Sequence, residues 1–128
     1  MARLRGAVLT HNHPRGLEFP KDDARSLGNS FSPDDLRLAC VAGLSELRVV
    51  TPRLRFRLRP PAGGWNETYW QATLEPAYAR HELAVTQEFF RAIQRGERSV
   101  AEAESAFFHE ICLRVSDELK LTYAREES

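Results

Sequence analysis

The sequence predicts one α+β domain: a small mixed sheet with a packed helix, followed by a C-terminal α-helical hairpin. Three observations predict this class. The chain has 128 residues, the length of a single domain. Residues 1–62 contain short apolar or alternating runs typical of strands, with one helical segment between them. Residues 63–128 contain two long segments whose apolar residues recur at helical spacing.

The first predicted element is a strand over residues 6–11. It leads into the sequence His11-Asn12-His13-Pro14, and the proline disfavours helix at the residue before it. Residues 15–31 are polar and interrupted by Gly and Pro, so we expect a long loop there. A loop of this length in a small domain is usually functional or disordered.

A helix is predicted to begin after Ser32 and to end near Ser45. Ser32 is a good N-cap, Pro33 suits the first helical position, and Asp35 can complete a capping box. A β-branched, apolar strand over residues 46–51 should follow.

A further strand is predicted over residues 53–59, where apolar residues and arginines alternate with period two. One face of this strand should carry Leu54, Phe56 and Leu58 toward a core, and the other should carry Arg53, Arg55, Arg57 and Arg59 outward. The next five residues, 60–64, read Pro-Pro-Ala-Gly-Gly and predict a turn before the helical half.

In the helical half, Asn66 is predicted to cap a long helix that Pro76 kinks or splits. Gly96 should end that helix, and Ser99 with Glu102 predicts a capping box for a second one. Two helices joined at Gly96 suggest an antiparallel hairpin. The apolar stripe expected on the second helix is Val100, Ala103, Phe107, Ile111, Val115 and Leu119.

Composition excludes several classes of protein. Hydrophobic residues make up 42% and charged residues 28%, which is ordinary for a globular protein and argues against disorder. No apolar run approaches the roughly 18 residues that span a bilayer, and none near the N-terminus has the about 7–15 residues of a secretory signal. Cys40 and Cys112 lie among apolar residues, so we expect reduced, buried thiols in a cytoplasmic protein.

Charge is unevenly distributed, although the net charge is zero. Residues 1–64 carry 11 basic and 6 acidic side chains, and residues 65–128 carry 7 basic and 12 acidic ones. Either the two halves attract each other, or the first half faces a polyanion.

The segment that points to chemistry is Thr10-His11-Asn12-His13-Pro14, together with Ser32 and Asp35. Two histidines at the end of a strand, where the chain turns, can converge on one ion. Neutral imidazoles suit Zn²⁺, and a carboxylate from a nearby helix can be a third ligand. A fourth, open position would hold a water whose pKa falls toward about 7. A serine at the start of the helix can stabilise an oxyanion.

His-Asn-His-Pro-x-Gly followed by Ser-x-x-Asp resembles the JAB/MPN metalloproteases, and among them the RadC-like branch and domains attached to phage head-morphogenesis proteins. The resemblance covers residues 7–59. It implies that His11, His13 and Asp35 are ligands of one zinc ion and that Ser32 is the catalytic serine that stabilises the oxyanion. It also implies a truncated JAB/MPN-like fold in residues 1–62. The hairpin of residues 63–128, which the resemblance does not cover, is expected to pack on that segment.

Two departures from the family pattern matter. Family members carry a catalytic Glu upstream of the first His, where it acts as general base. Only ten residues precede His11 here and none is acidic, so either the chain is the C-terminal piece of a longer protein or it lacks this base. Eighteen residues separate His13 from Ser32, a longer gap than in the family, so residues 17–29 would have to loop out.

Structural alternatives stand beside each of these roles. Ser32 and Asp35 are explained by a capping box alone, although a cap can also position a ligand. His81 and His109 lie in helices remote from the motif and are expected at the surface or in packing. The arginine stripe is either a solvated strand face or a surface that binds phosphates. The contiguous letters His-Asn-His are not the dispersed motif of HNH nucleases.

Two function classes therefore remain open. The first is a zinc-dependent hydrolase-like domain that acts on peptide or isopeptide bonds of a protein substrate, incomplete or inactive alone. The second is a non-enzymatic, phage-derived structural or interaction domain, whose arginine face and hairpin bind a phage structural protein or nucleic acid. A phage-derived chain would be cytoplasmic or associated with the virion.

Overall fold

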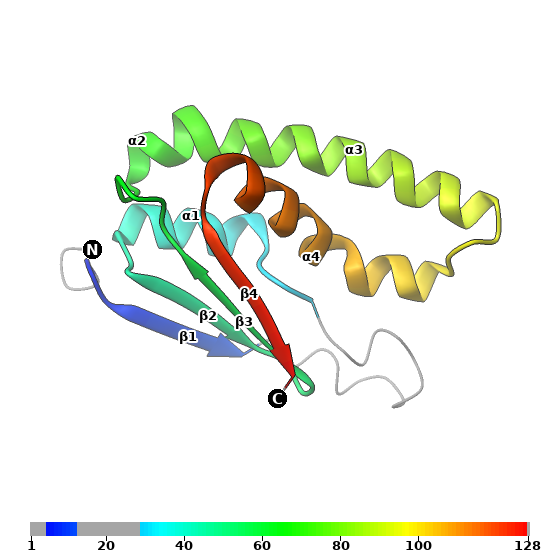
Figure 1. The fold of residues 1–128 in the computed structure, drawn as a ribbon, viewed down its shortest axis with the longest axis horizontal. Coiled ribbons are helices and arrows are strands. Elements are labelled where there is room, and N and C mark those ends of the chain that lie inside the picture. Colours follow the sequence, from blue (N-terminus) through cyan, green and yellow to red (C-terminus); the bar gives the residue numbers. More distant parts are fainter. Residues whose placement is uncertain (1–4, 13–28, 128) are drawn as a thin grey trace.

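The computed structural model describes residues 5–12 and 29–127, without the side chains of residues 11 and 12 (Figure 1). The elements, in chain order, are β1 (Val8–Asn12), α1 (Pro33–Ala42), β2 (Glu46–Val50), β3 (Leu54–Arg59), α2 (Glu67–Tyr69), the π-helical turn η4 (Trp70–Leu74), α3 (Glu75–Gln94), α4 (Val100–Leu119) and β4 (Thr122–Glu127). The predicted class, α+β with a mixed sheet, is confirmed. The expected loop over residues 15–31 lies mostly outside the described residues.

The four strands form one sheet in the order β1-β2-β3-β4. β1 is parallel to β2, and α1 connects them, whereas β2–β3 and β3–β4 are antiparallel neighbours. The hydroxyl of Ser45 donates a hydrogen bond of 3.1 Å to the carbonyl of Ala7, which joins the starts of β1 and β2.

β4 is an addition that the sequence patterns do not predict. It follows α4 directly and pairs with β3 along its whole length, from Arg59 opposite Thr122 to Leu54 opposite Glu127. Its six residues include one large apolar side chain, Tyr123, and three charged ones, so the strand has no apolar alternation. Residues 63–128 therefore contribute to the sheet as well as forming the helical hairpin.

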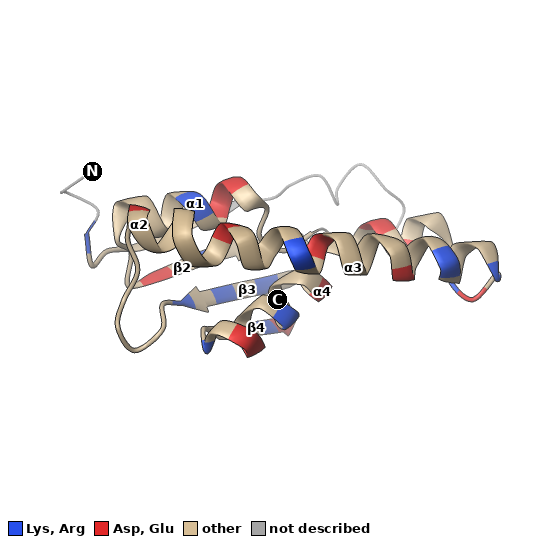
Figure 2. Cartoon of the chain, turned by 90° about the horizontal axis from the view of Figure 1, so that it is seen from above, with Lys and Arg blue, Asp and Glu red and all other residues tan. Residues whose placement is uncertain are grey.

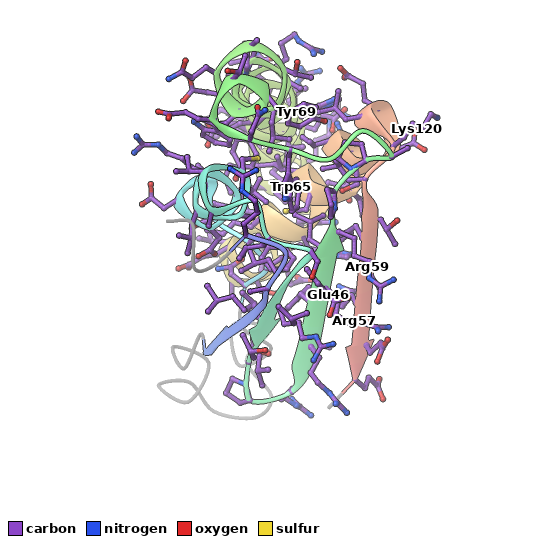
Figure 3. All side chains as sticks on the ribbon, turned by 90° about the vertical axis from the view of Figure 1, so that its left-hand side faces the viewer. Glu46, Arg57, Arg59, Trp65, Tyr69 and Lys120 are labelled. Carbon is purple, nitrogen blue, oxygen red and sulfur yellow. The ribbon has the colours of Figure 1, made fainter. Side chains whose placement is uncertain are left out.

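One face of the sheet packs against α1 and the hairpin, and no helix in the described part of the chain covers the other (Figures 1 and 3). The alternation on β3 accounts for this arrangement. Leu54, Phe56 and Leu58 are buried as predicted, and the arginines between them point away from the core. The core joins both halves of the chain through Phe31, Leu36, Leu47, Phe56, Trp70, Leu74, Val85, Ile111 and Val115.

The predicted caps are confirmed. The hydroxyl of Ser99 accepts a hydrogen bond from the Glu102 backbone N–H at 3.0 Å, and the Asn66 side chain accepts one from Tyr69 at 2.8 Å. Pro76 splits the long helix as expected. Because proline lacks an N–H and its ring crowds the carbonyl four residues earlier, the chain widens into the π-helical turn just before it.

The prediction that the whole apolar stripe of α4 is buried is wrong at Val100. Val100 is 65% exposed, because it lies at the end of the hairpin that extends beyond the sheet (Figure 1). In the part of the chain that the structure describes, no strand lies against that end. Ala103, Ile111 and Val115, which lie closer to the sheet, are buried as predicted.

Candidate functional site

The fold brings the C-terminal end of β1 and the start of α1 to the same end of the sheet, where the parallel strands β1 and β2 finish. In a parallel β-α-β unit the helix begins where the first strand ends, and Figure 1 shows this arrangement for β1, α1 and β2. His11 pairs with Val49 and Asn12 pairs with Val50 in the backbone register. The side chain of His11 and the whole of His13 lie outside the described residues.

Ser32 and Asp35 form the predicted capping box. The Ser32 backbone N–H donates to Asp35 Oδ2 at 2.9 Å, and the Asp35 backbone N–H donates to Ser32 Oγ at 3.3 Å. Asp35 is buried, with 7% of its surface exposed, at a helix N-terminus whose dipole favours negative charge. The capping contact of the carboxylate is made through Oδ2.

The predicted zinc trio is thus only partly described. Among the described side chains, no group of three or more His, Cys, Asp or Glu is close enough to hold a metal ion. That set contains Asp35 but neither imidazole of the motif. Two imidazoles and one carboxylate remain a donor set that suits zinc, with one position open.

A buried polar network, which sequence reasoning missed, adjoins the start of α1. The hydroxyl of Tyr123 lies 2.7 Å from Ser30 Oγ and 2.7 Å from His109 Nδ1. Ser30 is fully buried and stands two residues before Ser32. His109 is thus linked through Tyr123 to the segment that leads into α1, and its ring packs against Phe56, which agrees with the expectation of a packing residue. No local signal could have shown this contact, because Ser30 and Tyr123 are 93 positions apart in the sequence.

The electrostatics of this network favour a neutral imidazole. Burial, assisted by the charge of Arg125 and opposed by Glu110, lowers the pKa of His109 to about 4. Burial also raises the pKa of the Tyr123 hydroxyl above its ordinary value. The network therefore carries no charge at neutral pH, and it ties α4 and β4 to the segment that leads into α1.

The two cysteines are unsuited to nucleophilic chemistry. Both are free and buried, as predicted, and burial raises the pKa of each thiol to about 12. A thiol must ionise to act as a nucleophile, so these side chains are packing residues. Cys112 Sγ lies 3.6 Å from the carbonyl of Phe31.

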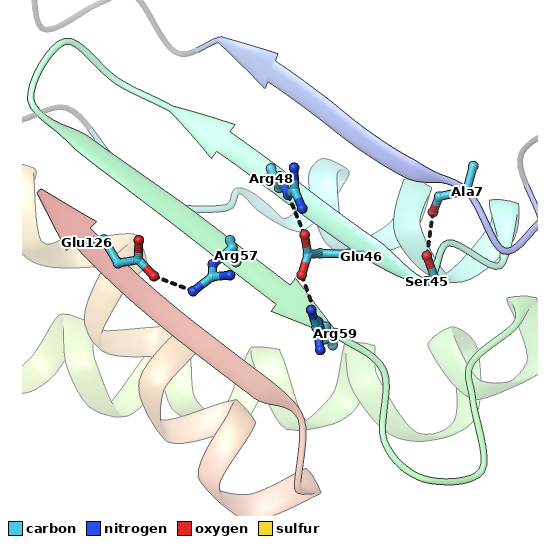
Figure 4. Close-up of polar contacts among 7 residues, drawn as sticks. All are labelled: Ala7, Ser45, Glu46, Arg48, Arg57, Arg59 and Glu126. Carbon is cyan, nitrogen blue, oxygen red and sulfur yellow. Dashed lines mark hydrogen bonds and ion pairs between the residues drawn. The ribbon is translucent and has the colours of Figure 1, made fainter. Parts of the chain in front are cut away.

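The uncovered face of the sheet carries a second group of charged side chains (Figure 4). Glu46 has 3% of its side chain exposed and accepts hydrogen bonds from Arg48 Nε and, at 2.7 Å, from Arg59 Nε. Burial alone would raise the pKa of Glu46, but the hydrogen bonds and charges of the two arginines outweigh burial and lower it. Arg57 pairs with Glu126 on β4.

The expectation that the basic first half attracts the acidic second half holds for only one of these two β3 arginines. Arg57 does bind a carboxylate of the second half, although from a strand rather than a helix. Arg59 instead binds Glu46 in its own half. In Figure 2, Lys and Arg positions recur along β3, whereas α3 carries both basic and acidic positions along its length.

Two hollows adjoin these elements. One of about 410 Å³ lies on the uncovered face of the sheet and is lined by Thr10, Arg48, Val49, Val50, Arg55, Phe56, Arg57 and Glu126. The other, of about 510 Å³, is an apolar cleft at the far end of the hairpin, with Phe89, Phe90, Ile93 and Phe107 among its lining residues.

Comparison of the chain with models of known protein families, with curated proteins and with solved structures finds no match in any of the three. Within the described ranges, no helix is both long and apolar enough to cross a bilayer.

Proposed function

We propose that this chain is a zinc-binding, JAB/MPN-like hydrolase domain that acts on peptide or isopeptide bonds. Its ion would be held by His11, His13 and Asp35. The observation that carries the proposal is the edge shared by the end of β1 and the start of α1, where Asp35 is a buried carboxylate. The sequence pattern of the family requires this arrangement of strand, helix and acidic residue.

Each residue would have a distinct part. A bound zinc ion supplies Lewis acidity and lowers the pKa of a bound water. Asp35 is already held in place by the Ser32 backbone N–H, which limits the conformational cost of binding a metal. Ser32 would donate its hydroxyl to an oxyanion that develops beside the start of α1.

Metal content is the first test. Protein purified without a histidine tag, loaded with zinc and desalted, should retain about one ion per chain by elemental analysis, as expected for one three-ligand site. The double variant His11→Ala/His13→Ala should retain none. His81→Ala is the matched control, since His81 binds Glu118 on the hairpin and should leave zinc content unchanged.

Asp35→Asn separates ligation from capping. Asparagine keeps a side-chain oxygen that can accept the hydrogen bond from the Ser32 backbone N–H, so the fold should survive while zinc affinity falls. A wild-type protein without zinc after loading would contradict the proposal. Retention of full affinity by Asp35→Asn would restrict Asp35 to its capping role.

A second candidate function, a non-enzymatic interaction domain, is favoured by the hollow on the uncovered face of the sheet. The arginines that line this hollow, Arg48, Arg55 and Arg57, are not among the residues proposed to bind zinc.

A further inference from the structure

We propose that the uncovered face of the sheet is a docking surface for an acidic, extended segment of a partner polypeptide. We call this surface the arginine face and define it by Arg48, Arg55, Arg57, Arg59, Glu46 and Glu126. The arginines would bind carboxylates of the partner. The proposal is independent of the zinc site, because it uses none of the residues of that site.

The backbone register places the arginines of the two central strands side by side. Arg48 on β2 lies opposite Arg57 on β3, and Arg55 lies opposite Val50. Alternate residues of a strand share a face and are spaced by about 6.5–7 Å, so Arg55, Arg57 and Arg59 form a regular row. The hollow of about 410 Å³ is lined by Arg55 and Arg57 of this row and extends from Thr10 on β1 to Glu126 on β4.

Glu46 holds two of these arginines in position. Both of its carboxylate oxygens are used, one by Arg48 and one by Arg59, and its side chain is 3% exposed. The arginine side chains remain 46% and 58% exposed. A guanidinium has five N–H donors, so each arginine keeps donors that face solvent after it has bound Glu46. Such pre-ordered donors lose less entropy when they bind a ligand.

The arginine face keeps an excess of positive charge. Its four arginines outnumber its two carboxylates. Among the described residues, Arg55 has no ion-pair partner, although it lines the hollow and is exposed. An incoming carboxylate can therefore bind Arg55 without displacing an existing pair.

The observations favour an acidic peptide over a nucleic acid. Proteins that bind single strands stack bases on aromatic side chains. The aromatic residues of the central and edge strands, Phe56 and Tyr123, belong to the cluster on the opposite, packed face. In contrast, an extended peptide with acidic residues at alternate positions repeats its carboxylates every 6.5–7 Å or so, which matches the arginine row.

The direct test is fluorescence anisotropy with a labelled Glu-Ser repeat of about eight residues, long enough to span β3. Its controls are a Gln-Ser repeat and an oligothymidine. At about 150 mM salt, the acidic peptide should bind and both controls should bind more weakly. The variant Arg55→Gln/Arg57→Gln should weaken binding about fivefold, as expected for the loss of two exposed charge pairs.

A matched variant controls for net charge. Arg91→Gln/Arg95→Gln removes the same charge from the far end of α3 and should leave peptide binding unchanged. If both double variants lose the same affinity for the acidic peptide, binding depends on net charge alone, and the proposal is overturned. Tighter binding of oligothymidine than of the acidic peptide would overturn it in favour of nucleic acid.

The variant Glu46→Gln tests whether peptide binding becomes tighter or weaker when this carboxylate is removed. Non-specific attraction predicts tighter binding, since a negative charge is removed. A surface that Glu46 organises predicts weaker binding, because Arg48 and Arg59 lose their common anchor. If Glu46→Gln lowers the melting temperature, Arg59→Lys replaces it: the charge is kept and the fork of donors is lost, so binding should weaken. Unchanged binding in Arg59→Lys would show that charge alone acts there.

Discussion

His109 shows how one residue links distant parts of this chain. Its imidazole contacts the Tyr123 hydroxyl, which in turn contacts Ser30 in the segment before α1. The imidazole also lies against the rings of Phe56 and Tyr123, with centroids 6.1 and 5.5 Å away. A neutral histidine satisfies the network and fits these apolar neighbours, whereas a charged one would have to be desolvated beside Arg125.

The lowered pKa of His109 predicts that folding stability depends on pH. The folded-state value of about 4 lies below the ordinary value of 6.5, so the unfolded chain binds the proton more readily. The contribution of His109 is therefore complete above pH 6.5 and is lost as the pH falls from there toward 4. Urea unfolding of the wild type and of His109→Gln at several pH values should show stabilities that converge in this window. Parallel curves would place the imidazole in contact with solvent.

At the level of elements, the helix caps are the features that the sequence predicts best. Ser32 with Asp35 and Ser99 with Glu102 each form both hydrogen bonds of a capping box. The reason is that a cap involves residues only three positions apart, so its whole mechanism is local. The alternation in β3 was equally informative, because period two determines which side chains are buried.

The two capping boxes provide a matched pair of variants. Ser32→Ala and Ser99→Ala each remove a cap, so each should lower the free energy of unfolding by about 1 kcal/mol. If Ser32 also acts at the proposed site, only Ser32→Ala should lower any peptidase activity of zinc-loaded protein at temperatures where both variants are folded. Equal activities in the two variants would leave Ser32 with the capping role alone.

Long-range pairing is what the sequence did not predict. β4 joins the sheet through backbone hydrogen bonds to β3, across more than 60 positions of chain, and its own residues are mostly polar or charged. Its pairing depends on the edge that β3 presents, which no local pattern of β4 encodes. The same holds for the hydrogen bonds among Ser30, Tyr123 and His109. At the candidate metal site, Ser32 and Asp35 were predictable because their contact is local.

Across the whole molecule, the two halves are joined mainly by packing and by the sheet. The Trp65 indole N–H donates to the carbonyl of Leu44 at 2.8 Å, and the rings of Phe31 and Tyr123 lie 6.1 Å apart. Arg57 and Glu126 add an ion pair between the halves, but both side chains are nearly half exposed, so its contribution is small. Among the described residues, packing and strand pairing therefore join the halves more than this ion pair does.

This arrangement predicts that neither half folds alone. A fragment of residues 1–62 would lack β4 beside β3 and the helix α4 that covers Phe31 and Phe56, so its buried apolar side chains would face water. A domain of about 60 residues is already marginal when its core is complete. We expect this fragment to show no cooperative thermal transition by circular dichroism. Mixing it with a fragment of residues 63–128 should restore the transition, because the missing strand and helix are then supplied in trans. A cooperative transition in residues 1–62 alone would instead make that segment an independent domain, with the hairpin and β4 as an appendage.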